Sequence, residues 1–175
     1  MATLKNLLIS IFCLTVYAGF AQPRDIRADL IKTYRSQIGV HELTGHNDGV
    51  AVENYLHYVG LGKGNPYCAS YVCWGYGQNH LPNPCSGYCP DLFRKGVIYK
   101  KGAKSNQTPL PADVYGIYFP EKGRIAHVGV VEIWGTKTVT GIEANTNVAG
   151  SRDGDGVYRK IRLTGQIAAV SRFLK

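Results

Sequence analysis

The stretch His127–Asn145, HVGVVEIWGTKTVTGIEAN, has the pattern of two antiparallel strands joined by a loop centred on Gly135. Folding the chain at that glycine predicts four cross-strand pairs, which are Val131–Val139, Gly129–Gly141, His127–Glu143 and Ile125–Asn145. Because side chains alternate along a strand, all four pairs lie on one face of the hairpin. Direct cross-strand partners have Cβ atoms about 4.5–5.5 Å apart, which allows a hydrogen bond between an imidazole and a carboxylate.

The pair Gly129–Gly141 lies between the valines and the histidine in this pattern. Two glycines facing each other in a sheet leave room for a close approach of another backbone. We therefore expect a further segment, such as the start of a helix, to come close to this part of the hairpin.

A helix is predicted from Asn65 as the N-terminal cap and Pro66 as the first helical residue, running towards Gln78 and weakened by its late glycines. Cys68 then takes the third helical position. Free N–H groups and the helix dipole stabilise a thiolate there and lower the pKa of the thiol. The alternative is a buried structural cysteine, because free cysteine is among the most buried residue types.

A thiol at a helix start and a histidine held by a carboxylate or amide are the parts of a thiol acyl-transfer site. In this interpretation His127 takes the proton of Cys68 and later protonates the leaving amine, while Glu143 or Asn145 fixes the imidazole tautomer. The competing interpretation of His127 is a histidine that is merely hydrogen-bonded at a strand end. A register error of one residue would place the partners on opposite faces.

The rest of the chain predicts an α+β fold with N-terminal helices packed on an antiparallel sheet. Asp25–Ile38 and Gly49–Val59 have helical spacing, with Asn47 or Asp48 as the cap of the second helix. Leu92–Tyr99 reads as a short apolar helix or strand. Five β-rich runs follow, at Val114–Phe119, Ala126–Ile133, Thr138–Ala144, Val157–Leu163 and Ala168–Phe173.

Residues 1–21 predict a signal peptide, with Lys5, an apolar run from Leu7 to Phe20 and cleavage after Ala21. The run is shorter than the roughly 18–20 apolar residues that span a bilayer, so no stable membrane span is expected. Residues 22–175 are then a single exported domain, periplasmic or extracellular.

The chain of 175 residues is 45% hydrophobic, which excludes disorder, and it has no nucleotide-binding glycine motif. Removing Lys5 from 20 lysines and arginines leaves 19 against 12 acids, a net charge of +7. Nucleic acid, lipid headgroups and cell-wall polymer are the anionic partners to consider. The basic residues are scattered without a nucleic-acid-binding module, which predicts diffuse attraction to a cell envelope and no nucleic acid.

Four cysteines remain after cleavage, at 68, 73, 85 and 89. In an oxidising compartment an even number of cysteines predicts disulfides. One scheme leaves Cys68 free and pairs Cys85 with Cys89 or with Cys73. A four-cysteine zinc site is the alternative, but the spacings lack Cys-x-x-Cys knuckles, so no metal is expected.

Five segments together resemble the CHAP members of the NlpC/P60 superfamily, exported bacterial cysteine peptidases and amidases. They are GVHELTGHNDGVAVENYLHYVGLGKGNPYCASYVCW, PADVYGIY, HVGVVE, EANTN and GDGVYRK, and the resemblance spans about Ile26 to Arg162. It implies a papain-like fold, no cofactor, and hydrolysis of amide bonds in peptidoglycan peptides. The family's catalytic residues fall on Cys68, His127, Glu143 and Asn145.

The chain departs from the family in three places. Tyr67 stands where relatives often have Trp, Ala112-Asp113 stands where many have Gly-Asp, and the Cys85/Cys89 loop is an addition. The oxyanion needs two donors, and we expect one from the Cys68 backbone N–H and a second from Tyr67 or residues 46–48. Tyr67 could also flank the cleft and touch substrate. The remaining histidines, His41, His46, His57 and His80, are expected on the surface.

The leading hypothesis is a monomeric secreted peptidoglycan hydrolase, an N-acetylmuramoyl-L-alanine amidase or a peptide endopeptidase, that works through a thiol acyl-enzyme. Two alternatives stay open. One is a wall-binding module of the same fold that has lost turnover, and the other is an antibacterial amidase toxin. Specificity lies in loops, so the bond cleaved stays undetermined at this point.

Overall fold

The computed structural model describes residues 24–104, 106–148 and 154–174. The predicted signal peptide and its cleavage site therefore lie outside the described residues. The three α-helices of the described part are α1 (Ile26–Arg35), α2 (Val50–Tyr58) and α3 (Cys68–Gln78). The strands are β1 (Val97–Lys100), β2 (Val114–Phe119), β3 (Arg124–Trp134), β4 (Thr138–Thr146), β5 (Gly156–Leu163) and β6 (Ile167–Ser171). Short 3-10 helices are η1 (Cys89–Phe93), η2 (Pro120–Lys122) and η3 (Thr164–Gln166).

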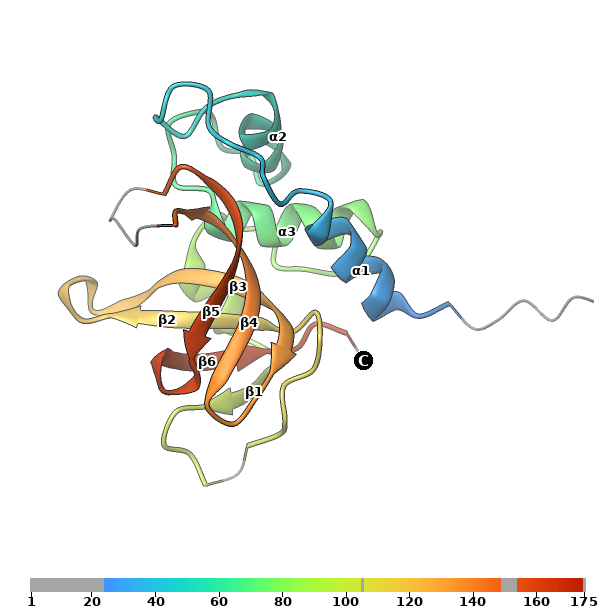
Figure 1. Cartoon of the computed structure of the whole chain (residues 1–175), viewed down its shortest axis with the longest axis vertical. Helices are drawn as coiled ribbons and strands as arrows, with labels where there is room; N and C mark the ends of the chain where they lie inside the picture. Colours follow the sequence, from blue (N-terminus) through green and yellow to red (C-terminus); the bar gives the residue numbers. More distant parts are fainter. Residues whose placement is uncertain (1–23, 105, 149–153, 175) are drawn as a thin grey trace, which may run out of the picture.

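The strands form one sheet in the order β1-β6-β2-β3-β4-β5, and every neighbouring pair is antiparallel. Figure 1 shows the helices gathered on one side of the sheet, with α3 between α2 and the strands. Among the helices, α3 contacts β3 and β4. The α+β prediction with an antiparallel sheet is confirmed, and the arrangement is consistent with the papain-like fold that the resemblance implies.

Helix α1 begins where its sequence predicts. The side chain of Asp25 accepts hydrogen bonds from the backbone N–H groups of Arg27 and Ala28, which caps the helix. Its inward face buries Tyr34, whose ring lies against Gly75 of α3. A Cβ added to Gly75 would come within 2.2 Å of the Tyr34 ring, so this glycine allows the two helices to pack closely.

Helix α3 begins later than predicted. Its first helical residue is Cys68 and its N-cap is Tyr67, because the first helical hydrogen bond runs from Tyr71 N–H to Tyr67 O at 2.8 Å. Asn65 is not the cap, since its side-chain amide donates to the carbonyl of Gly62 and closes the preceding turn. Cys68 therefore has the first helical position, where the backbone N–H is free of the helix's own hydrogen bonds.

Neither Asn47 nor Asp48, the two predicted caps of the second helix, caps it. The N-cap of α2 is Gly49, without a side-chain cap. The carboxylate of Asp48 accepts instead from the backbone N–H and hydroxyl of Thr44, at 2.9 and 2.7 Å. It stabilises the loop before the helix rather than the helix itself.

The hairpin β3–β4 forms, but its register differs from the prediction. Val131 lies opposite Gly141 and Trp134 opposite Val139, so Val131 and Val139 do not pair. The register shifts between Val131 and Ile133, where Glu132 is an extra residue on β3. The turn is centred between Thr136 and Lys137 instead of on Gly135, which shifts the pairing by three residues, and the bulge removes one of them, so Val131 meets a residue two positions further along β4 than predicted. A two-residue shift keeps each side chain on its predicted face, because the side-chain period of a strand is two.

The two faces of the sheet carry different clusters. Val114, Val128, Val130 and Ile142 belong to the main core that the helices share. The opposite face carries a second buried cluster that contains Tyr115, Val131 and Val139. By strand alternation His127, Gly129, Gly141 and Glu143 lie on this second face.

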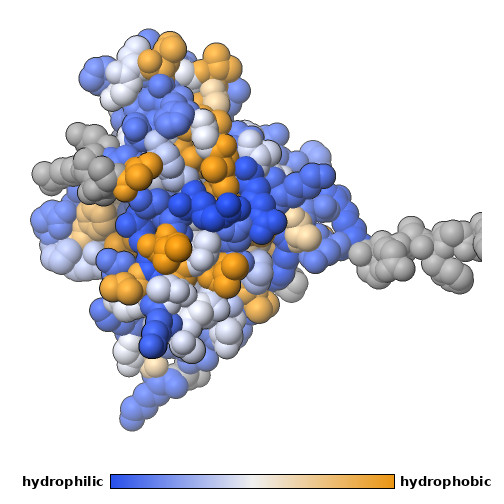
Figure 2. Space-filling model, in the orientation of Figure 1, coloured by the Kyte–Doolittle hydropathy of each residue, from blue (hydrophilic) through white to orange (hydrophobic). Residues whose placement is uncertain are grey.

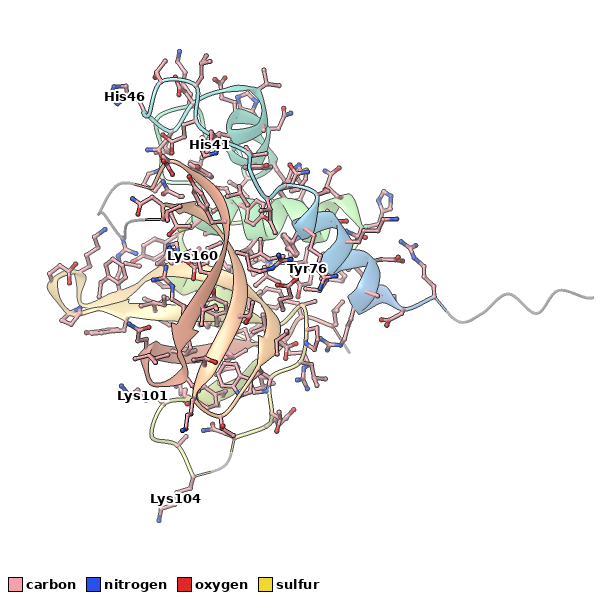
Figure 3. All side chains as sticks on the ribbon, viewed as in Figure 1. His41, His46, Tyr76, Lys101, Lys104 and Lys160 are labelled. Atoms are coloured by element: carbon pink, nitrogen blue, oxygen red, sulfur yellow. The ribbon has the colours of Figure 1, made fainter. Side chains whose placement is uncertain are left out.

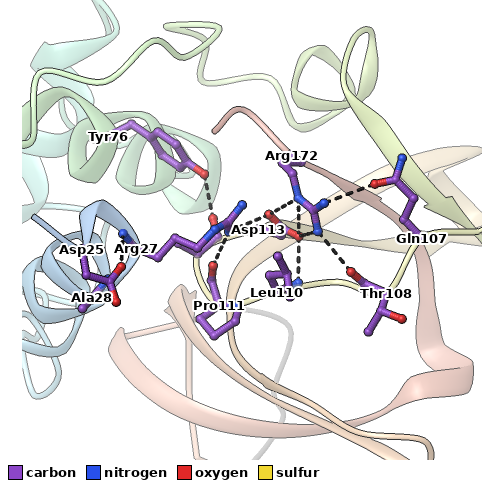
Figure 4. Close-up of polar contacts among 11 residues, drawn as sticks. Asp25, Arg27, Ala28, Tyr76, Gln107, Thr108, Leu110, Pro111, Asp113 and Arg172 are labelled. Carbon is purple, nitrogen blue, oxygen red and sulfur yellow. Dashed lines mark hydrogen bonds and ion pairs between the residues drawn. The ribbon is translucent and has the colours of Figure 1, made fainter. Parts of the chain in front are cut away.

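A buried carboxylate ties the start of β2 to both ends of the described chain. Asp113 is 1% exposed and accepts hydrogen bonds from Arg27 of α1 and from Arg172, which follows β6 (Figure 4). It also accepts from the backbone N–H of Leu110 at 2.8 Å. Ala112 beside it has a φ of 71°, the left-handed conformation that favours glycine.

The surface is mixed in character. On the face drawn in Figure 2, hydrophilic residues dominate and apolar residues form separate patches. Within the three described ranges, no helix has the length and apolar character needed to cross a membrane.

Candidate active site

Cys68 lies at the first helical position of α3, with its sulfur against β3. The Cys68 Sγ accepts a hydrogen bond from the backbone N–H of Val128 and forms another with the side chain of His127. A second sulfur, that of Cys89 in η1, lies 3.5 Å away. Cys68 is 5% exposed and His127 9% exposed. The thiol and the imidazole thus meet at a nearly closed part of the surface.

The imidazole of His127 is held by a carboxylate on the neighbouring strand. His127 Nε2 lies 2.8 Å from Glu143 Oε2. Because Nε2 is engaged by Glu143, Nδ1 is the ring nitrogen left for Cys68. Cys68, His127 and Glu143 therefore form one hydrogen-bonded chain, in the arrangement of a nucleophile, a base and an orienting acid.

A β-bulge precedes the histidine. In the β2–β3 ladder Ile117 pairs with His127 and Tyr118 with Ile125, which leaves Ala126 as an extra residue on β3. A bulge bends its strand and changes the direction in which a side chain points. This bulge therefore helps to aim His127 at the start of α3.

Two residues that the sequence analysis missed hold Glu143. The Tyr115 hydroxyl donates to Glu143 Oε1 at 2.6 Å, and Arg162 Nε donates to the same oxygen at 2.7 Å. Arg162 also donates to Oε2 through Nη2. With His127, these donors engage both oxygens of a carboxylate that is 0% exposed.

The space at the two glycines is filled by a side chain and not by a backbone, so that prediction is wrong. Tyr115 pairs with Gly129 across β2 and β3. A Cβ on Gly129 would lie 2.5 Å from the Tyr115 ring, and one on Gly141 would lie 2.3 Å from its hydroxyl. The glycines admit the tyrosine that positions Glu143. Such a glycine pair beside a buried tyrosine is the sequence signal that could have indicated this contact.

The site favours an ionised thiol. Hydrogen bonds from Cys89 and from His127 hold the pKa of Cys68 well below its usual range, although burial opposes this. Burial alone would lower the pKa of His127, but the hydrogen bonds and negative charges of Cys68 and Glu143 outweigh it and raise that pKa to about 9. Thiolate and imidazolium therefore stabilise each other at neutral pH.

Glu143 stays ionised beside them. Burial alone would raise the pKa of Glu143, but hydrogen bonds from Arg162 and His127 and their charges hold it far below its usual range. The positive charge of Arg162 offsets much of the negative charge of Glu143. Glu143 therefore orients the His127 ring and stabilises the imidazolium charge only in part.

Asn145 does not join this chain of hydrogen bonds. A further bulge falls at Asn145 on β4, where the residue has a φ of 56°. Its side-chain amide donates to Asn47 Oδ1 at 2.9 Å. Of the two predicted orienting residues, the structure places Glu143 against His127 and directs Asn145 to the loop before α2.

Two residues that were predicted to line the cleft or bind the oxyanion, Tyr67 and Asn47, are engaged elsewhere in the structure. Tyr67 is 0% exposed and stacks on Tyr55 with ring centroids 6.2 Å apart, so the suggestion that it touches substrate is corrected to a core role. The backbone N–H of Asn47 donates to Glu42, which occupies that candidate oxyanion donor. The four other histidines, His41, His46, His57 and His80, are exposed as predicted. Figure 3 shows His41 and His46 beyond the top of the sheet.

The cysteines do not follow the predicted pairing. Cys68, Cys73, Cys85 and Cys89 are all free thiols, and Cys89 lies beside Cys68 and not beside Cys85. Cys73 contacts the carbonyl of Ser86, and Cys85 that of Tyr58. In residues 24–104, 106–148 and 154–174, no group of three or more His, Cys, Asp or Glu side chains could hold a metal ion.

No protein-family model and no curated protein matches the chain. Among solved structures, the fold is similar to the crystal structure of an NlpC/P60 family protein from Bacillus cereus ATCC 10987. The two share 15% sequence identity with a TM-score of 0.49, over 85% of this chain. The chain spans 40% of the length of that protein. The assignment of Cys68, His127 and Glu143 rests on their own geometry and not on this similarity.

Proposed function

We propose that this protein is a cysteine hydrolase that cleaves amide bonds in peptidoglycan peptides through Cys68, His127 and Glu143. The observation that carries the proposal is the buried chain from the Cys68 sulfur through the His127 imidazole to the Glu143 carboxylate. A wall-binding module without turnover has no need of an ionised thiol beside an imidazolium. The geometry therefore favours an enzyme over the inactive alternative.

The reaction follows from the positions of the three side chains. The Cys68 thiolate attacks the amide carbonyl carbon, and the oxygen takes the negative charge. His127 Nδ1–H gives its proton to the leaving nitrogen as the C–N bond breaks, which leaves a thioester on Cys68 and a free amine. Water then gives a proton to Nδ1 and attacks the thioester, which releases the acid and restores thiolate and imidazolium.

The start of α3 offers a place for the oxyanion. The backbone N–H of Cys68 is at the first helical position, where no intrahelical acceptor exists, and the helix dipole adds positive potential. We propose this N–H as one oxyanion donor. Loss of a single such donor in a hydrolase costs about 10² to 10³ in kcat.

The substrate and the compartment are further parts of the proposal. Peptidoglycan follows from the resemblance to CHAP members of the NlpC/P60 superfamily, and the net charge of +7 expected after signal cleavage suits an anionic wall. We propose export with cleavage after Ala21. The mass of the secreted protein would then correspond to a chain that begins at Gln22.

The test is a digest of purified cell walls by the wild type and by Cys68→Ala, with released muropeptides identified by mass spectrometry. We expect new amine and carboxyl termini at one type of amide bond with the wild type only. Cys73→Ala is the matched control, because Cys73 is a buried thiol of the same helix outside the site. Equal release by the wild type and Cys68→Ala would reject the nucleophile.

A further inference from the structure

The thiol of Cys89 touches the Cys68 sulfur but takes part in no bond-making or bond-breaking step of the proposed hydrolysis. Its Sγ lies 3.5 Å from Cys68 Sγ, and both cysteines are buried, at 4% and 5% exposure. The two sulfurs come from different elements, η1 and the start of α3, separated by 21 residues. This is a pair of thiols held in contact inside the protein.

Several contacts hold Cys89 at that place. Ser86 Oγ donates to Asp91 at 2.7 Å and accepts from the backbone N–H of Tyr88 at 3.1 Å. The guanidinium of Arg124, at the start of β3, lies 4.9 Å from the centre of the Tyr88 ring. The loop is thus fastened both to itself and to the strand that carries His127. The approach of the two sulfurs is therefore a built feature of the fold.

We propose that Cys68 and Cys89 form a reversible disulfide that switches the hydrolase off under oxidising conditions. A disulfide bond is about 2.05 Å long, so the sulfurs must approach by roughly 1.5 Å. A change of this size needs rotation of the two side chains and a small adjustment of the loop. The consequence for catalysis rests on the proposed function, whereas the disulfide itself depends only on the two thiols.

The chemistry is thiol–disulfide exchange with a small disulfide as the oxidant. The Cys68 thiolate attacks one sulfur of the oxidant, which forms a mixed disulfide and expels one thiolate. The Cys89 thiol then loses its proton and attacks the Cys68 sulfur, which closes the internal disulfide and releases the second thiolate. The protein loses two hydrogens, and one disulfide is reduced to two thiols. A dithiol reductant reverses both steps.

The protonation states of Cys68 and Cys89 suit this order of exchange steps. The pKa of Cys68 lies well below its usual range, first because Cys89 donates a hydrogen bond to it, and the pKa of Cys89 is raised for the same reason. Cys68 is therefore the thiol that reacts first with an external disulfide. Once Cys68 is in the mixed disulfide, it no longer bears the charge that keeps Cys89 protonated.

The experiment treats the reduced protein, expressed from the full chain, with oxidised glutathione and digests it without reductant for mass spectrometry. We expect a cross-linked pair of peptides that contains Cys68 and Cys89. Hydrolysis of cell walls should fall at least about tenfold and return with dithiothreitol. Cys85→Ser is the matched control from the same loop, and its Cys68–Cys89 cross-link should form as in the wild type. In Cys89→Ser, a glutathione adduct should remain on Cys68.

The results separate the two proposals. Cys68 that stays unlinked while Cys89 joins Cys85, or Cys68 that keeps glutathione in the wild type, would overturn the disulfide. If the reduced wild type does not hydrolyse walls, the proposed function fails, and the peptide map still decides whether the disulfide forms. Because the map is made on the wild type, the result does not depend on the folding of any variant.

Discussion

Three hydrogen-bond donors meet at the sulfur of Cys68. They are the thiol of Cys89, the side chain of His127 and the backbone N–H of Val128. Each of them favours the thiolate over the neutral thiol, and together they outweigh the cost of burial. These neighbours thus favour the thiolate that the proposed hydrolysis requires, before any substrate binds.

The proposed hydrolysis should depend on pH through this ion pair. We expect kcat/KM to stay high into mildly acidic solution, because the pKa of Cys68 is depressed. It should fall on the alkaline side at about pH 9, where the imidazolium of His127 loses its proton. These limbs belong to the coupled pair and not to either residue alone. An activity that instead rises through about pH 8.5, the usual pKa of a free thiol, would contradict the ion pair.

Glu143 and Asn145 are distinguished by substitution. Glu143→Gln removes the charge that stabilises the imidazolium, so we expect kcat to fall on the order of 10² and the alkaline limb to move to lower pH. Asn145→Ala should change kcat only a few-fold, because its amide contacts Asn47 and not His127. Thermal unfolding of both variants shows whether each is folded. A larger loss in Asn145→Ala than in Glu143→Gln would reverse the assignment.

At the scale of the elements, the site depends on how β2, β3 and β4 stack their side chains. Tyr115 crosses from β2 over Gly129 of β3 and Gly141 of β4 to reach Glu143. The tyrosine is possible there only because both neighbours lack a side chain. The two glycines are thus a requirement for the position of the carboxylate.

Gly141→Ala tests this packing. Its new Cβ would lie 2.3 Å from the Tyr115 hydroxyl, so the ring must move and its bond to Glu143 is lost. We expect stability to fall by about 1–3 kcal/mol, as for other overpacked cores, together with a fall in kcat. The control is Gly165→Ala, where no heavy atom lies within 4 Å. A Gly141→Ala protein as stable and active as this control would show that Tyr115 has no positioning role.

The hairpin also shows what the sequence could predict. The alternation of side chains placed His127 and Glu143 on the same face, and the structure agrees. The pairing itself was wrong because the turn is centred between Thr136 and Lys137 and not on Gly135, a three-residue error that the bulge at Glu132 reduces to two residues for His127 and Glu143. Because side chains alternate with a period of two, the remaining two-residue error left His127 and Glu143 on their predicted face. Tyr115 and Arg162 were missed because they reach Glu143 from β2 and β5, strands whose order in the sheet no local pattern gives.

At the scale of the whole molecule, Asp113 links the first helix, the start of β2 and the last described residues. Arg27 and Arg172 both bind its carboxylate (Figure 4). Tyr115 follows two residues later on β2, so this network also fixes the strand whose tyrosine hydrogen-bonds Glu143. The proximity of Cys68 and Cys89 likewise depends on the whole fold. A loop between helix and sheet brings them together, which explains why cysteine spacing alone predicted other pairs.

Asp113→Ala should therefore weaken the entire fold. Removal of one partner from a buried ionic network costs about 3 kcal/mol, which chemical denaturation would measure. The control is Asp29→Ala, whose ion pair with Arg24 is solvent-exposed and should contribute about 1 kcal/mol or less. Similar losses in the two variants would contradict a structural role for the Asp113 network.

The ionisation state of Cys68 can be measured without any substrate. A thiolate absorbs ultraviolet light on the short-wavelength side of the aromatic bands much more strongly than a thiol does, so reduced wild type and Cys68→Ser can be compared at neutral pH. We predict that the wild type shows the absorbance of one additional thiolate, that this absorbance is lost only on strong acidification, and that His127→Ala reduces it. Identical spectra for the wild type and Cys68→Ser at neutral pH would show that the Cys68 thiol is not ionised.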